Sequence, residues 1–143
     1  MSGFLETSVQ ITVPFHDADP AGIVWHGNYF RYFELARCAL LDQINYNYRQ
    51  MAESGYVWPI VDLSSRFNLP VSFQESIEVV ARLVEWEFRL VMHYRVLNQA
   101  GQETARGVTV QVPVASDSGE LLIGVPAIFE QRVAAARAKA GLE

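Results

Sequence analysis

The chain alternates apolar and polar residues in several separate stretches, and this period of two is typical of strands that bury one side. The first alternating stretch covers residues 9–15. Later stretches cover residues 58–63, 65–71, 77–83, 90–96 and 108–112, with a turn at 98–101. An interruption near Ser64 and Pro70 predicts an edge strand or a bulge, because proline cannot donate a ladder hydrogen bond. The pattern therefore predicts one strand at the start of the chain and about four antiparallel strands in its second half.

A spacing of three and four residues between apolar positions replaces the alternation after Tyr29. This spacing is typical of a helix, and no Gly or Pro interrupts it before Gly55. We therefore expect one long helix that begins with Asn28 as its N-cap and ends within residues 45–54. Apolar and aromatic residues lie on most faces of this helix, so we expect other elements to surround it.

A shorter second helix is predicted near the C-terminus, where Pro126 precedes an Ala- and Arg-rich stretch over residues 127–139. The order of elements is then a strand, a long helix, about four antiparallel strands and a short helix, which is typical of an α+β domain. A chain of 143 residues has the usual length of one domain. We therefore expect residues 1–143 to share a single core.

Composition narrows the range of partners. Half of the residues are hydrophobic and 19% are charged, which predicts that some apolar surface is buried between subunits. The net charge of -5 and the absence of any Lys/Arg cluster in the sequence disfavour a nucleic-acid partner. Cys38 is the only cysteine, which fits a reducing compartment, and no apolar stretch approaches the roughly 18 residues of a membrane span. We therefore expect a cytoplasmic homo-oligomer without a transmembrane segment.

The segment between the first strand and the long helix, residues 16–29, concentrates groups that can carry chemistry. It holds two carboxylates, two imidazoles, a Pro, two glycines and an Asn. Asp19 is held in extended geometry by Pro20, and we expect its carboxylate to project near the positive N-terminal end of the helix. There it can serve as a base or a nucleophile while helix-start N–H groups polarise a carbonyl. The alternative is a structural Asp that caps a turn.

The sequence from Asp17 to Trp25, with Asn28-Tyr29 after it and Glu34 and Arg37 further on, resembles the signature of the 4-hydroxybenzoyl-CoA thioesterase family. The resemblance implies a hotdog fold, in which an antiparallel sheet wraps around one long central helix. It also implies a thioesterase that hydrolyses an acyl-CoA or aryl-CoA thioester, or an acyl-carrier-protein thioester, to an acid and a thiol. The family's shared pocket implies a dimer or a tetramer.

The resemblance further implies roles for particular residues. Asp19 falls on the family's catalytic Asp, as general base or nucleophile, and His26 falls where a backbone N–H polarises the thioester carbonyl, with a helping side chain in several relatives. The implied substrate-binding residues are Gly22, Trp25, Asn28, Tyr29, Glu34, Ser64, Ser65, Arg66 and Phe67. The last four of these map to a strand of a neighbouring subunit that completes the pocket in this family.

Recognition of coenzyme A is the point at which this sequence departs from the aryl-specific members of the family. Those members carry a basic cluster after a Trp in the third strand, whereas Trp86 is followed here by Glu87, Phe88 and Arg89. Other candidates for phosphate contacts are isolated along the sequence, at Arg66, Arg82, Arg95 and Arg106. We therefore expect weak, strongly salt-dependent binding of coenzyme A, with most of the binding energy coming from the acyl group. A carrier-protein substrate is the alternative.

Several candidate residues also have structural interpretations. His26 can pack at the helix start, Glu34 can form a helical ion pair with Arg37, and Cys38 can be a small buried hydrophobe. A metal site is disfavoured because four polar residues in one loop do not establish convergent ligands, and no cofactor is implied. Two other functions stay open, namely a hotdog hydratase or dehydratase and a non-catalytic acyl-thioester binding protein.

Overall fold

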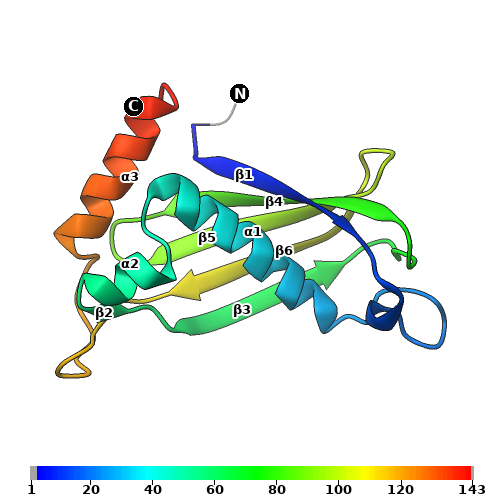
Figure 1. Ribbon diagram of the computed structural model, residues 1–143, viewed down its shortest axis with the longest axis horizontal. Coiled ribbons are helices and arrows are strands. Elements are labelled where there is room, and N and C mark those ends of the chain that lie inside the picture. Colours follow the sequence, from blue (N-terminus) through cyan, green and yellow to red (C-terminus); the bar gives the residue numbers. More distant parts are fainter. Residues whose placement is uncertain (1–2, 143) are drawn as a thin grey trace.

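A five-stranded antiparallel sheet forms the framework of the protein in the computed structural model, which describes residues 3–142 (Figure 1). Its strands are β1 (Glu6–Thr12), β3 (Ile60–Phe67), β4 (Ser76–Glu85), β5 (Leu90–Leu97) and β6 (Glu103–Gln111), in the spatial order β1-β4-β5-β6-β3. Two short strands, β2 (Tyr56–Val57) and β7 (Val114–Ala115), pair separately. Alternation builds the sheet: Val79 and Ala81 of β4 are buried, while Val80 and Arg82, which follow them in turn, are half-buried.

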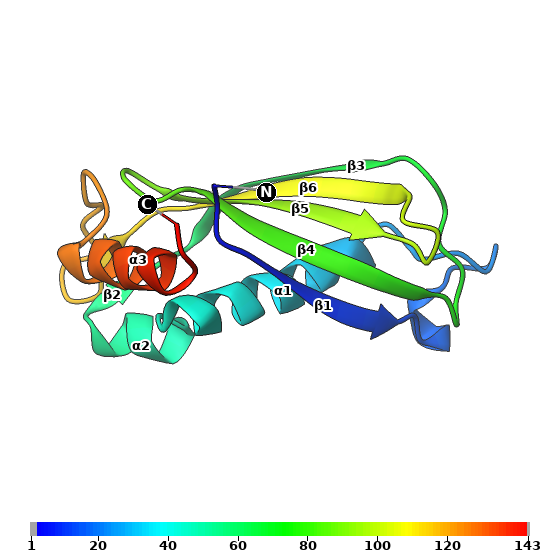
Figure 2. The same cartoon turned by 90° about the horizontal axis from the view of Figure 1, so that it is seen from above.

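Three α-helices within the described residues accompany the sheet: α1 (Asn28–Ile44), α2 (Tyr48–Glu53) and α3 (Ala127–Lys139). Seen from above, α1 lies along one side of the sheet, and within residues 3–142 no helix covers the other side (Figure 2). The predicted α+β class and the bounds of the C-terminal helix are confirmed. None of the helices in this part of the chain is long and apolar enough to cross a membrane.

Some strand boundaries differ from the alternation in the sequence. β1 ends before Pro14, and Phe15 opens a short 3₁₀ turn in which its side chain is 76% exposed, because proline cannot continue the ladder. β3 continues through Ser64 without a break, and its register shift lies next to Ile60 instead. β6 begins at Glu103, well before the predicted start.

The ends of α1 are set by residues other than those predicted. Gly27 is the N-cap and Asn28 is the first helical residue, so the prediction of Asn28 as cap is wrong by one position. Asn45 ends the helix in the left-handed conformation, with φ at 62°, which Asn adopts more readily than most residues. A separate helix then starts after Asn47, whose side chain accepts a hydrogen bond from the Gln50 N–H.

The core lies between the inner side of α1 and the sheet. Tyr32, Phe33 and Leu40 are fully buried there, and the Phe33 ring stacks on Tyr94 at a centroid distance of 4.7 Å. The outer side of α1 is not covered, since Leu35 is 48% exposed. The prediction that other elements surround α1 is therefore wrong within one chain, because the single sheet covers only one side of the helix.

β3 is an edge strand with apolar side chains left in solvent. Val61 is 58% exposed, and Ile60, Leu63 and Phe67 are each more than 40% exposed. One backbone edge of β3 pairs with β6, and the other edge has no strand partner among the residues that the structure describes. An exposed apolar edge strand is a surface on which a second chain can add its own strand.

Candidate active site

The loop of residues 16–27 leads from the end of β1 into α1 at one end of the sheet (Figure 1). Backbone hydrogen bonds tie it to the connection between β3 and β4. The Val24 N–H donates to the Val71 carbonyl at 2.7 Å, and just before the loop the Val13 carbonyl accepts from the Gln74 N–H at 2.8 Å. The loop is therefore held by the same ordered backbone that supports the sheet.

Asp17 fastens this loop to the first turns of α1. Its carboxylate is 1% exposed and accepts hydrogen bonds from the Arg31 guanidinium and from the Tyr32 hydroxyl, the latter at 2.6 Å. Its carbonyl accepts from the Trp25 N–H and from the Asn28 side-chain amide, both at 2.9 Å. Burial would raise the pKa of the Asp17 carboxyl, but the hydrogen bonds from Arg31 and Tyr32 and the charge of Arg31 outweigh burial and hold this pKa below its ordinary value.

Asp19 lies in a tight turn and leaves one carboxylate oxygen free. Its Oδ1 accepts from the Ala21 N–H at 2.8 Å, and its carbonyl accepts from the Gly22 N–H at 2.9 Å. Gly22 has a φ of 81°, a conformation that favours glycine. No donor within residues 3–142 reaches Oδ2. One oxygen of Asp19 thus caps the turn, as the structural alternative predicted, while the other is available to water or substrate.

The start of α1 offers backbone donors next to this loop. Across residues 3–142, the N–H groups of His26 and Gly27 donate to no acceptor. The ring of Trp25 lies against Gly27, where an added Cβ would come within 2.2 Å of it, and the ring centroids of Trp25 and His26 are 5.0 Å apart. Free N–H groups at a helix N-terminus stabilise negative charge on a nearby oxygen.

Aromatic side chains form the apolar part of this region. The ring centroid of Phe67, at the end of β3, lies 5.1 Å from that of Tyr29 and 6.3 Å from that of His26. Tyr29 is 3% exposed, and its burial, with a contribution from the negative charge of Glu75, raises the pKa of its hydroxyl to about 12. These contacts place Phe67 beside the start of α1 in its own chain, whereas the resemblance implied that it contributes to the pocket of a neighbouring subunit.

Other predicted residues lie elsewhere. Glu34 is exposed and accepts a hydrogen bond from the buried Arg37 at 3.1 Å, which is the helical ion pair of the structural interpretation. Cys38 is half-buried, and burial raises the pKa of its thiol, so it is not an activated nucleophile. Ser64, Ser65 and Arg66 line a cavity of about 570 Å³ on the sheet face opposite α1.

The same cavity overturns the expectation that the arginines are isolated. Arg66, Arg82, Arg95 and Arg106 all line it. Each lies on a different strand, and the antiparallel register aligns these positions across the sheet although they are far apart in sequence. Arg89 lies outside the cavity and donates to Glu85 at 3.0 Å.

Arg31 and Tyr32 are the site residues that sequence reasoning missed. Both reach the buried carboxylate of Asp17 from the first turns of α1. The available signal was an acidic residue just before a helix whose first turns carry an Arg and a Tyr. The pattern of residue types does not reveal which of the loop's two carboxylates is buried.

Comparisons with known proteins agree with this architecture. A family model described as the thioesterase-like superfamily matches residues 13–138. YneP of Bacillus subtilis (strain 168), provisionally named an acyl-CoA thioesterase, is 27% identical over 110 residues, which cover 76% of this chain and 80% of YneP. The structure of 4-hydroxybenzoyl-CoA thioesterase from Pseudomonas sp. strain CBS-3 is 28% identical, with a TM-score of 0.76, over 89% of this chain and 98% of that chain. The DHNA-CoA thioesterase of Staphylococcus aureus shares the fold, with a TM-score of 0.81 at 21% identity over 95% of this chain and 91% of that chain.

The protein is thus a hotdog-fold enzyme that hydrolyses thioesters. The chain belongs to the thioesterase-like superfamily, whose model covers most of its length. Two predictions are confirmed: the resemblance of the loop residues to a thioesterase family, and the hotdog fold. The alternatives of a hydratase and of a non-catalytic binding protein are not favoured, because these relatives are named as thioesterases.

Proposed function

We propose that the protein hydrolyses an acyl-CoA or aryl-CoA thioester, with Asp19 as the general base or nucleophile and the His26 N–H as the donor to the oxyanion. The observation that carries this proposal is the free Oδ2 of Asp19 in a loop that leads into the unpaired N–H groups of His26 and Gly27. A base and an oxyanion site in one rigid segment are the two elements that acyl transfer requires. The named substrates of the relatives support coenzyme A as the thiol.

The proposed reaction uses water and no cofactor. Asp19 takes a proton from a water molecule, whose oxygen attacks the thioester carbon. The carbonyl oxygen becomes negative and accepts a hydrogen bond from the His26 N–H, with the N-terminal end of α1 adding to its stabilisation. Collapse of this intermediate breaks the C–S bond, releasing the acid and a thiolate that takes up a proton. In the nucleophilic alternative, the Asp19 carboxylate attacks the carbon directly, and water then hydrolyses the resulting anhydride.

Substrate contacts are proposed for the residues around the loop. Trp25 is 51% exposed and Phe67 is 45% exposed, so both rings are accessible to an acyl group beside the helix start. Gly22 and Asn28 shape the loop, and Tyr29 supplies a buried ring beneath it. We keep Glu34 as a lining residue only for a pocket that includes a second subunit, because within one chain it is paired with Arg37.

We also propose a homo-oligomer, a dimer or a tetramer, in which β3 pairs with β3 of a second copy. The support is the open edge of β3 and the exposed Val61 and Leu63 upon it. In such an assembly Ser64, Ser65, Arg66 and Phe67 contribute to the pocket of the neighbouring copy. The single cysteine, Cys38, fits the proposed cytoplasmic location.

The function is tested by thiol release from a panel of acyl-CoA and aryl-CoA thioesters. We expect Asp19→Asn to fold normally and to lose at least about tenfold in kcat/KM, which corresponds to about 1.4 kcal/mol of barrier. Asp117→Asn, in an exposed turn, is the matched control. An Asp19→Asn enzyme that keeps more than a tenth of the activity contradicts the assignment, and no thiol release by the wild type contradicts the function. Single turnover in heavy-oxygen water then tests the anhydride route, because label enters Asp19 only when water attacks the Asp19 carbonyl carbon of the anhydride.

A further inference from the structure

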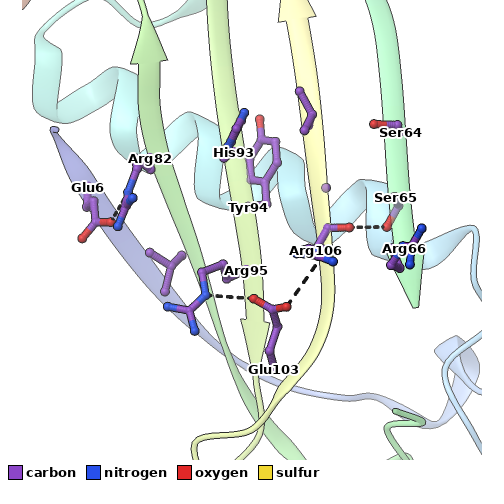
Figure 3. Close-up of a pocket in the computed structure, with 13 residues that line it drawn as sticks. Glu6, Ser64, Ser65, Arg66, Arg82, His93, Tyr94, Arg95, Glu103 and Arg106 are labelled. Carbon is purple, nitrogen blue, oxygen red and sulfur yellow. Dashed lines mark hydrogen bonds and ion pairs between the residues drawn. The ribbon is translucent and has the colours of Figure 1, made fainter. Parts of the chain in front are cut away.

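The outer face of the sheet, on the side away from α1, carries a row of arginines (Figure 3). Arg66 is the only one of them with a place in the proposed substrate pocket, and the proposed reaction assigns the others no role. Arg106 of β6 pairs directly with Arg66 of β3 on one side and with Arg95 of β5 on the other. In the neighbouring row, Arg82 of β4 lies opposite His93 of β5. All five residues line the cavity of about 570 Å³.

Carboxylates neutralise only part of this positive charge. Glu103 accepts a hydrogen bond from Arg95 at 3.0 Å and lies 4.0 Å from Arg106, so one carboxylate serves two guanidinium groups. Glu6 pairs with Arg82. No carboxylate in the part of the chain that the structure describes lies within 4 Å of the Arg66 guanidinium. The four arginines therefore exceed the two lining carboxylates, on a protein whose net charge is -5.

Like charges on directly paired strand positions are unfavourable, so this row is maintained at a cost to folding. An anion placed between the guanidinium groups removes that cost. Phosphate groups suit such a row, because guanidinium groups bind phosphate oxygens in paired hydrogen bonds, and two adjacent phosphates match several adjacent arginines. Self-association through this face fits less well, since it brings the net positive lining of one copy against that of another.

We propose that the outer-face cavity binds a ligand with two or more phosphate groups, held chiefly by Arg66, Arg95 and Arg106. Two sources supply this chemistry: the phosphorylated nucleotide end of the coenzyme A thioester, or a free nucleotide that acts as an effector. The first source rests on the proposed function. Binding of a phosphate ligand to the cavity is measured without turnover, so its outcome is independent of the roles proposed for Asp19 and His26.

The test is calorimetric titration with inorganic pyrophosphate. We expect Arg106→Gln to weaken binding by roughly tenfold or more, as for the loss of a charge-assisted hydrogen bond. Glu103→Gln is expected to change affinity in the opposite direction and tighten binding, because it removes the competing carboxylate. Arg49→Gln is the matched control, since this exposed arginine of α2 is paired with Glu53 outside the cavity. It should bind pyrophosphate like the wild type.

Thermal unfolding distinguishes loss of the phosphate site from a folding defect in the variant. Since Arg106 faces Arg66 and Arg95, Arg106→Gln relieves repulsion, and we expect its Tm without ligand to equal or exceed that of the wild type. Pyrophosphate should raise the Tm of the wild type and have little effect on the variant. Absence of wild-type binding at millimolar pyrophosphate, or equal binding by Arg106→Gln and Glu103→Gln, overturns the proposal. Loss of binding accompanied by a changed mass in light scattering also overturns it, in favour of an interface between copies.

Kinetics distinguish the two sources. If the phosphates belong to the substrate, Arg106→Gln raises KM for an acyl-CoA and leaves KM for the same acyl group on pantetheine unchanged. If they belong to an effector, KM changes for neither thioester, and added nucleoside diphosphate alters the rate of the wild type but not of the variant. Both results support a phosphate site. An effect of Arg106→Gln on the two thioesters alike, with no response to nucleotide, contradicts it.

Discussion

Asp17→Asn tests the interpretation that a buried carboxylate holds the active-site loop on α1. The substitution keeps the size of the side chain and removes its charge. Asp17 accepts from both Arg31 and Tyr32, whereas the new amide has one oxygen and one NH₂. If the oxygen stays with Arg31, the NH₂ donates to the Tyr32 hydroxyl, and the proton of that hydroxyl loses its buried acceptor. The side chain at this position is 1% exposed, so water has little access to repair the mismatch.

The magnitude follows from the two lost interactions. A hydrogen bond to a charged group contributes about 1.5–3 kcal/mol when its partner is buried, which applies to the Tyr32 hydroxyl. The Arg31 side chain is 48% exposed, so water screens its interaction and replaces it in the variant, and we assign it less than about 1 kcal/mol. We therefore expect a loss of about 2–3 kcal/mol in the free energy of unfolding at neutral pH. For a chain of this length that corresponds to a fall of roughly 4–12 °C in Tm.

The pH dependence has a defined sign. The pKa of Asp17 is lower in the folded protein than its ordinary value of 3.8. Its contribution to stability is therefore complete above that ordinary value and is lost as the pH falls through the lower, folded pKa. The difference in stability between the wild type and Asp17→Asn should be constant from neutral pH down to about pH 5 and then shrink in more acidic solution.

Urea unfolding followed by circular dichroism across this pH range measures both quantities, with Asp117→Asn as the control for removing an exposed carboxylate. A loss below about 0.5 kcal/mol at pH 7, which is the range of ordinary surface substitutions, refutes the reasoning. So does a difference that stays unchanged at low pH. A double-mutant cycle with Tyr32→Phe should give a coupling energy above about 1 kcal/mol, because the two groups share one buried hydrogen bond.

Two further predictions concern the edge strand and the helix start. Val61→Glu should convert the oligomer to a species of 16.1 kDa in light scattering, because it places charge on the exposed edge, while Leu121→Glu, on an equally exposed loop residue, should not. A 16.1 kDa wild type would contradict the proposed pairing. Gly27→Ala should lower kcat/KM by roughly tenfold or more, because its Cβ lies 2.2 Å from the Trp25 ring and must displace it beside the oxyanion donors. The Tm of this variant should change little because Trp25 is half-exposed. An unaltered kcat/KM would contradict a role for the position of the Trp25 ring in catalysis.

Local periodicity predicted most of the elements because each strand and helix buries residues at its own repeat. β4 and β5 start and end within a few residues of the alternating stretches, and α3 covers the predicted 127–139. Periodicity fails where a single backbone conformation decides the structure. Asn45 adopts a left-handed conformation that ends α1, and its residue type permits this conformation without requiring it.

Tertiary register was beyond what the sequence pattern predicts. Alternation places Arg95 on the outer side of its strand, whereas Arg106 lies before the predicted start of the last strand. The distance between the two depends on which residues pair across β5 and β6. A shift of the pairing by two residues would keep both side chains outward and separate them. This is why arginines that are isolated in the sequence line one cavity in the structure.

The two carboxylates of the loop illustrate how environment rather than motif assigns a role. Asp17 accepts a hydrogen bond on each oxygen and is 1% exposed, so burial keeps its carboxylate away from water and substrate. Asp19, two residues further on, is half-exposed and uses one oxygen for the turn. A base must reach the proton it removes, so of these two carboxylates Asp19 is the one placed for the proposed role of base, whereas Asp17 holds the loop against α1. Loss of Asp17 should therefore lower stability together with activity, and loss of Asp19 should lower activity alone.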